Sequence, residues 1–144
     1  MTTTAKLFAS LFFALCFQSA SGQNHTKAAA ICTAETEAPF TGEYWDHHEN
    51  GNYSCKNCGH TLFSSNAKFN SGTGWPSFDE PAIKNGIAER QDTTLGMVRT
   101  EVICANCKVH LGHLFADGPT KSGLRYCVNS YALEFKDGSE KENK

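Results

Sequence analysis

The sequence "YSCKNCGH" (residues 53–60) has a near repeat, "VICANCKVH" (residues 102–110), and this pair sets the architecture of the chain. In each stretch a strand-like run ends in a Cys-x-Asn-Cys turn. Such a turn presents two thiolates at the separation that a tetrahedral Zn²⁺ requires, and two turns complete a shell of four sulfur ligands. A full shell has no open position for a substrate, so the metal is structural. The predicted zinc ligands are Cys55, Cys58, Cys104 and Cys107.

Two other interpretations of these cysteines stay open at this point. Each pair can form a local disulfide, or one pair can be the redox site of a thiol–disulfide oxidoreductase. A redox Cys-x-x-Cys normally opens a helix within a βαβ unit, and no such unit surrounds either turn. The interval at residues 59–103 is longer than in a short zinc ribbon, so a whole subdomain must separate the two turns.

Residues 1–22 have the composition of a secretory signal peptide. Lys6 gives a positive start, Leu7–Phe17 is an unbroken small and apolar run, and Ala20 and Gly22 suit a cleavage site. The run is shorter than the roughly 20 apolar residues that a spanning helix needs; a buried N-terminal helix is the alternative. We therefore expect the mature chain to enter the secretory pathway, for secretion or for the endoplasmic reticulum.

The remaining composition fits one soluble domain. The chain has 144 residues with 13 basic and 15 acidic side chains, for a formal net charge of −2. The basic residues are scattered, which argues against nucleic-acid binding, and no later apolar run can span a membrane. We expect a monomer with a flexible segment at residues 23–37, a folded domain at residues 38–136 and a charged tail at residues 137–144.

Short alternating runs separated by Gly, Asn and Pro predict a mainly β fold of antiparallel strands. A helical turn is expected near residues 26–38, and residues 78–90 form either a short helix or an irregular crossing. The predicted strands are "GNYSC" (51–55), "TLFSS" (61–65), "GMVRTEVIC" (96–104), "HLGHLFAD" (110–117) and "RYCVNSYALEF" (125–135).

The cysteine in "RYCVNS" differs from the paired ones. Strand alternation places Arg125, Cys127 and Asn129 on one face, while Tyr126 and Val128 point into the packing. A neighbouring guanidinium favours the thiolate, which is the nucleophilic form of cysteine. The alternative is a small core residue, a common place for cysteine.

Two further stretches carry residues suited to chemistry. In "HLGHLF", His110 and His113 can exchange a proton near neutral pH; the alternatives are zinc ligation and a solvated surface. In "SGTGWPSF", the glycines and Pro76 hold Trp75 in a fixed loop, where an exposed indole would form a wall for an apolar ligand. A tryptophan buried in the core is the other interpretation.

Taken together, Gly-x-Gly-Trp-Pro-Ser-Phe, His-x-Gly-His-x-Phe and Arg-Tyr-Cys-x-Asn resemble the B-type methionine sulfoxide reductases. The resemblance extends over about residues 38–136. It implies two packed antiparallel sheets, called a β-tent, with structural zinc at one end. It also implies reduction of the R epimer of methionine sulfoxide in oxidised proteins, with a thioredoxin-like or other thiol donor.

The resemblance also assigns roles to the residues above. Cys127 matches the catalytic cysteine, which would attack the sulfoxide sulfur and become a sulfenic acid. His113 or His110 would supply the proton as general acid.

Four neighbouring residues would complete the site. Trp75 and Phe115 would hold the S-methyl group, and this apolar pocket would select the epimer. Arg125 and Asn129 would keep the thiol ionised and the histidines in place.

The sequence departs from the family at Thr73, where many members carry a second cysteine that resolves the sulfenic acid. Recycling must then use an external thiol, or Cys32 as a resolving cysteine. A competing interpretation is a zinc-stapled β-tent that binds a ligand without a nucleophile.

Overall fold

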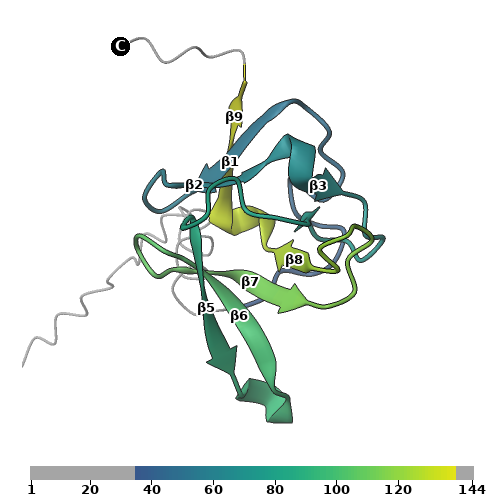
Figure 1. The fold of residues 1–144 in the computed structure, drawn as a ribbon, viewed down its shortest axis with the longest axis vertical. Helices are drawn as coiled ribbons and strands as arrows, with labels where there is room; N and C mark the ends of the chain where they lie inside the picture. The colour runs from purple at the N-terminus through teal and green to yellow at the C-terminus, as the bar shows by residue number, and fades with distance from the viewer. Residues whose placement is uncertain (1–34, 139–144) are drawn as a thin grey trace, which may run out of the picture.

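The computed structural model describes residues 35–138, which form two antiparallel sheets (Figure 1). The predicted mainly β fold is confirmed. The smaller sheet has the order β2-β1-β9, with β1 at Gly51–Cys55, β2 at Thr61–Ser64 and β9 at Leu133–Asp137.

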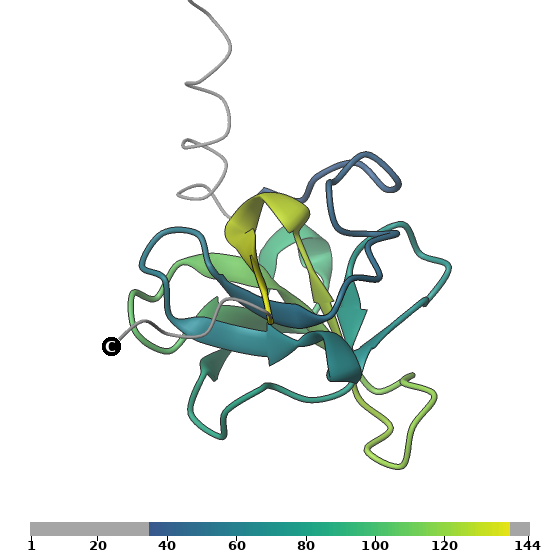
Figure 2. The same ribbon diagram turned by 90° about the horizontal axis from the view of Figure 1, so that it is seen from above.

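The larger sheet has six strands in the order β3-β4-β8-β7-β6-β5. Its strands are β3 (Lys68–Phe69), β4 (Ser77–Phe78), β5 (Ile87–Asp92), β6 (Arg99–Cys104), β7 (His110–Phe115) and β8 (Arg125–Val128). Three 3₁₀ turns connect strands: η1 (Ser65–Ala67), η2 (Thr94–Gly96) and η3 (Ser130–Ala132). Seen from above, the small sheet lies in front of the large one (Figure 2).

Aromatic rings fill the space between the sheets. Phe63 of the small sheet stacks on Phe78 of the large sheet at 4.3 Å between ring centroids, and Tyr53 meets Phe78 at 5.1 Å. All three side chains are fully buried. Tyr126 and Val128 of β8 also belong to this core, as strand alternation predicted. The other face of β8 is therefore free to serve the site.

One predicted strand, residues 125–135, is wrong as a single element. The chain leaves the large sheet after Val128, turns through η3, and enters the small sheet as β9. The backbone N–H of Asn129 donates to Leu111 at 2.8 Å, which ends β8 beside β7. The connection between the two sheets therefore begins two residues after Cys127.

The interpretation of residues 78–90 is corrected in part. Residues 79–86 form an irregular crossing, one of the two predicted alternatives, but Ile87 begins β5, a strand that the sequence did not reveal. The two-residue strands β3 and β4 were missed as well. Within residues 35–138 the helical structure consists of the 3₁₀ turns, and none of it is long and apolar enough to cross a membrane.

Several predictions concern residues outside the described part of the chain. The signal peptide at residues 1–22, Cys32 and most of the helical turn expected near residues 26–38 all precede residue 35. The tail at residues 137–144 is described only as far as residue 138. These remain predictions.

Candidate active site and metal centre

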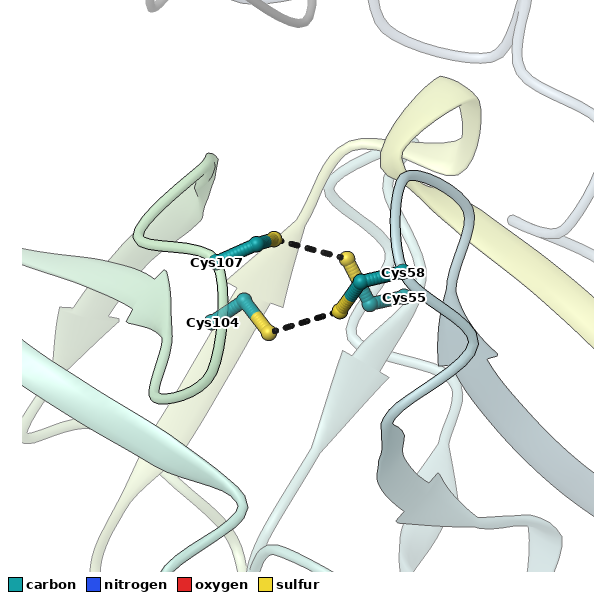
Figure 3. Close-up of side chains that lie close together, drawn as sticks. All are labelled: Cys55, Cys58, Cys104 and Cys107. Atoms are coloured by element: carbon teal, nitrogen blue, oxygen red, sulfur yellow. Dashed lines mark hydrogen bonds between the residues drawn. The ribbon is translucent and has the colours of Figure 1, made fainter.

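The four paired cysteines point toward one another from two facing turns (Figure 3). Their sulfur atoms all lie within 4.8 Å of one another. The Sγ atoms of Cys55 and Cys107 are 3.6 Å apart, and those of Cys58 and Cys104 are 3.7 Å apart. The sequence thus predicted correctly which four residues come together.

These distances fit a zinc ion and do not fit disulfides. A tetrahedron with Zn–S bonds near 2.3 Å has sulfur–sulfur edges of about 3.8 Å, whereas bonded sulfurs lie about 2.05 Å apart. The cluster is a structural zinc site with a complete shell. Thiolates held by zinc are not free for exchange, which also disfavours a redox role for either Cys-x-x-Cys pair.

The two cysteine turns have the same backbone geometry. The Gly59 N–H donates to the backbone oxygen of Cys55 at 2.7 Å, and the Lys108 N–H donates to the backbone oxygen of Cys104 at 2.9 Å. Gly59 and Lys108 both adopt positive φ, 72° and 63°. Glycine accepts this conformation readily, whereas lysine rarely does. The second turn holds its shape despite that cost, which fits a turn fixed by the shared zinc site.

Cys127 lies at the centre of β8, between two strands. It is paired with His113 of β7 on one side and with Ser77 of β4 on the other. Directly opposed residues in antiparallel strands have Cβ atoms about 5 Å apart. The strand register therefore places the Cys127 thiol and the His113 imidazole next to each other.

A cavity of about 140 Å³ opens at Cys127. Its lining includes Trp75, Arg99, His113, Phe115, Cys127 and Asn129. The half-buried Trp75 is held by a hydrogen bond from its indole Nε1 to the backbone oxygen of Glu37, at 3.0 Å. The ring is thus fixed at the cavity wall and is not a core tryptophan.

The ionisation of Cys127 differs from the sequence expectation. Burial raises the pKa of the Cys127 thiol above its ordinary value, and the guanidinium of Arg125 and a hydrogen bond with Thr73 offset this only in part. Arg125 acts in the predicted direction, but burial outweighs it. The resting group at neutral pH is therefore the thiol.

Arg125 and Asn129 are anchored away from the histidines. Arg125 donates to both carboxylate oxygens of Asp117, at 2.8 and 2.9 Å, and its guanidinium lies 4.4 Å from the centre of the Phe115 ring. The side-chain nitrogen of Asn129 donates to the Leu111 carbonyl at 3.2 Å. The described hydrogen bonds of Asn129 fix backbone segments, not the imidazoles.

His113 is held by a carboxylate that sequence reasoning missed. Its Nε2 lies 2.8 Å from Asp92, which also accepts from Arg99 at 2.7 Å. Hydrogen bonds from the hydroxyl and backbone N–H of Thr94, and from His113, hold the pKa of Asp92 far below its ordinary value. An ionised carboxylate only accepts, so Nε2 carries a proton and Nδ1 is the nitrogen left to exchange one.

His110 has a parallel arrangement deeper in the fold. Its Nδ1 lies 2.8 Å from Glu101, and Arg90 donates to the same carboxylate at 2.7 and 3.0 Å. Burial lowers the pKa of His110, which Glu101 opposes. His110 is buried and does not line the cavity at Cys127.

A β-bulge brings the two histidines together. Residues three apart in a regular strand point to opposite faces. The pairing of β6 with β7 shifts between Val102 and Ile103, which leaves Leu111 as an extra residue in β7. The rings of His110 and His113 consequently lie 5.4 Å apart, edge to face.

The N-terminal end of the described chain also borders the site. Glu37 N–H donates to the side-chain oxygen of Asn129 at 3.1 Å, and its carboxylate accepts from Ser130 N–H at 2.7 Å. Thr36 lines the cavity itself. Nothing in the sequence pointed to Glu37. Arg99 and Glu101, in contrast, alternate in the strand run "RTEV", so they share a face and could have been recognised from that pattern.

The fold and the site define a thiol-based enzyme built on a zinc-stapled pair of antiparallel sheets. The SelR domain model matches residues 24–137. A protein of Thiobacillus denitrificans named peptide methionine sulfoxide reductase MsrB is 63% identical over 100 residues, which cover 69% of this chain and 76% of that protein. The same name belongs to a Bradyrhizobium diazoefficiens protein, 55% identical over 106 residues (74% and 76%). It also belongs to a Herminiimonas arsenicoxydans protein, 56% identical over 102 residues (71% and 74%).

The chain belongs to this family, the B-type methionine sulfoxide reductases. Membership confirms the resemblance inferred from the motifs. A ligand-binding β-tent without a nucleophile is not favoured, because Cys127 and His113 stand together in one cavity.

Proposed function

We propose that this protein reduces the R epimer of methionine sulfoxide in oxidised proteins to methionine, with a thiol reductant restoring the enzyme. Family membership supports the activity. The observation that carries it is a single cavity that combines a thiol, an imidazole and two aromatic walls: Cys127, His113, Trp75 and Phe115.

In the proposed reaction the sulfur of Cys127 attacks the sulfoxide sulfur while the sulfoxide oxygen gains a proton. The attack forms an S–S bond; the protonated oxygen then moves to the Cys127 sulfur as this S–S bond and the substrate S–O bond break, and the products are methionine and a Cys127 sulfenic acid. The substrate gains two electrons and Cys127 loses two. The proton lost by the thiol balances the proton gained by the oxygen.

We assign the proton transfer to His113. It lies opposite Cys127 in the β7–β8 register, and Asp92 fixes its ring through Nε2. Because burial keeps Cys127 protonated, the imidazole would take the thiol proton and then deliver it to the departing oxygen. His110 lies behind His113 and would support it through the ring contact at 5.4 Å.

Trp75 and Phe115 would receive the S-methyl group. A cavity of about 140 Å³ holds one small side-chain end. With the sulfur at Cys127, exchange of methyl and oxygen would place the polar oxygen against a ring, where it lacks a hydrogen-bond partner. Arg125 would favour the thiolate as it forms, and Asn129 would hold the N-terminal segment at the cavity rim.

Recycling requires a thiol that Thr73 does not provide. Cys32 is our proposed resolving cysteine, with direct reduction by an external thiol as the other route. Thr36 lines the cavity and follows Cys32 by four positions. Four residues span at most about 14 Å when extended, which keeps Cys32 within reach of this rim. A thioredoxin-like protein would then reduce the disulfide.

We also propose that the enzyme works as a monomer within the secretory pathway or outside the cell. The signal-peptide composition of residues 1–22 supports this location. The reductant must then be available outside the cytosol.

The direct test is an assay of purified protein, beginning after Gly22, on separate R and S epimers of a methionine sulfoxide peptide with dithiothreitol as donor. We expect turnover of the R epimer alone. Equal turnover of both epimers would contradict the assigned pocket, and turnover of neither would contradict the activity.

A further inference from the structure

The loop between β5 and β6 exposes an apolar surface for which the reaction chemistry has no use. Of the five large apolar side chains exposed within residues 35–138, three lie here: Leu95, Met97 and Val98 are 82%, 49% and 74% exposed. We name residues 93–98 the tip loop. Figure 1 shows the end of the β5–β6 hairpin extending beyond the other strands, with η2 at its tip. Exposed apolar clusters of this kind mark interaction sites.

The backbone of the tip loop holds this surface in place. Leu95 has φ of 56°, in the left-handed region, and Gly96 follows with φ of 70°. A bulky residue in that region is strained, and such strain persists where the surrounding structure demands it. The Asp92 carboxylate caps the loop through the hydroxyl and N–H of Thr94, at 2.7 and 2.9 Å. The same carboxylate holds His113, so the tip loop and the site share one anchor.

Two grooves connect the tip loop to the cavity at Cys127. One, of about 610 Å³, is lined by Leu95 and reaches His113 and Arg99. The other, of about 650 Å³, is lined by Val98 and reaches Phe115 and Arg99. Arg99, His113 and Phe115 also line the small cavity. A chain whose methionine sulfoxide enters that cavity therefore has groove surface available between the cavity rim and the tip loop.

Most charges in the grooves are already paired. Arg90 is bound to Glu101 at 2.7 Å, and Arg99 is bound to Asp92 at 2.7 Å. Within residues 35–138, Glu35 and Glu89 line the grooves without an ion pair, but both are exposed, where attraction to a cation is screened by solvent, whereas Leu95 and Val98 offer apolar contact. The grooves consequently suit uncharged, apolar residues.

We propose that the tip loop binds the residues that flank methionine sulfoxide in a protein substrate, and that it favours apolar flanking side chains. This inference rests on the proposed function and adds a specificity determinant to it. The small cavity recognises the oxidised side chain, while Leu95 and Val98 contact its neighbours along the chain.

The test compares three substrates with dithiothreitol as donor: N-acetyl methionine-R-sulfoxide amide, a pentapeptide with leucine on both sides of the sulfoxide, and its counterpart with serine. The variant is Leu95→Asn with Val98→Thr. Asparagine tolerates positive φ and threonine keeps the shape of valine, so the loop is preserved. The control is Ile83→Ser, another exposed apolar residue (44%) that lines neither groove.

We expect the double variant to raise KM for the leucine peptide about fivefold to tenfold, the size of one lost partly buried apolar contact. The KM values for the serine peptide and the amide, and every kcat, should stay unchanged, as should all values for Ile83→Ser. Equal loss on all three substrates, or no loss on any, would overturn the proposal.

The measurements also distinguish two other possible binding partners of the tip loop. A defect seen only with a thioredoxin-like protein as donor would assign the surface to the reductant, and a dimer that dissociates in the double variant would assign it to a second copy. Either result overturns the proposal. Failure of the unaltered protein on the amide itself would instead refute the proposed function.

Discussion

Gly112 is the position where a single methyl group should damage the site most directly. It lies in β7 between the two histidines, opposite Val128. A Cβ at this position would be 1.9 Å from the carbonyl oxygen of Cys127 and 2.9 Å from the Val128 Cα. Both contacts involve backbone atoms, which cannot rotate away. Gly112→Ala must therefore separate β7 from β8.

The size of the effect follows from these distances. Ordinary Cβ contacts begin above 3.0 Å, so the strands must move apart by about 1 Å at this pair. That movement separates His113 from Cys127, and a misplacement of about 1 Å can cost roughly 100-fold in rate. Overpacking of this kind should also lower the free energy of unfolding by about 1–3 kcal/mol.

The assay combines kcat/KM on an R-sulfoxide peptide with thermal unfolding and zinc content. The control is Gly138→Ala, where the added Cβ meets nothing closer than 3.5 Å. We expect a folded, zinc-loaded Gly112→Ala protein with about 100-fold lower kcat/KM. Unchanged activity in this variant would refute the claim that the β7–β8 spacing positions the reacting groups.

Four more results are expected. Cys58→Ser should release zinc and sharply lower the unfolding temperature, because structural zinc binding contributes folding free energy; unchanged metal content would contradict the site. His113→Ala should slow single-turnover chemistry about 10²–10⁴-fold, and more than His110→Ala does; an unchanged rate in both variants would exclude a proton-transfer role for His113. Because burial raises the pKa of Cys127, kcat/KM should increase from neutral to alkaline pH, and Arg125→Met should displace the increase to higher pH; a flat pH profile would contradict this. Thr73→Cys should form a disulfide with Cys127 after one turnover, since the Thr73 hydroxyl already contacts that sulfur; free thiols at both positions by mass spectrometry would show that the geometry is unsuitable.

The zinc ligands and the polar face around Cys127 were predictable because both follow from local spacing. A Cys-x-x-Cys turn brings its two thiols together whatever the rest of the chain does, and strand alternation fixes the direction of Arg125, Cys127 and Asn129. The near repeat of the two turns already predicted that they share one metal ion, and the match of all motifs to one family agreed with that prediction.

What the sequence did not reveal depends on contacts between distant segments. The apolar alternation of residues 125–135 shifts at Asn129 and Ser130, from even to odd positions, but this shift does not say that the chain changes sheet there. Asp92 reaches His113 only through the six-stranded sheet. The raised pKa of Cys127 depends on burial, which an adjacent arginine does not reveal. The bulge at Leu111 likewise decides which histidine faces the thiol.

The central claim is that Cys127 is the sulfur that accepts the oxygen, and mass spectrometry after a single turnover tests it most directly. The protein is mixed with one equivalent of an R-sulfoxide peptide without reductant, then digested and mapped. We predict about one methionine product per chain, with Cys127 either carrying one added oxygen or joined to Cys32 by a disulfide. Cys127→Ser should form no product while keeping its zinc. Methionine formed in full yield with Cys127 recovered as a free thiol, or by the Cys127→Ser protein, would contradict the account.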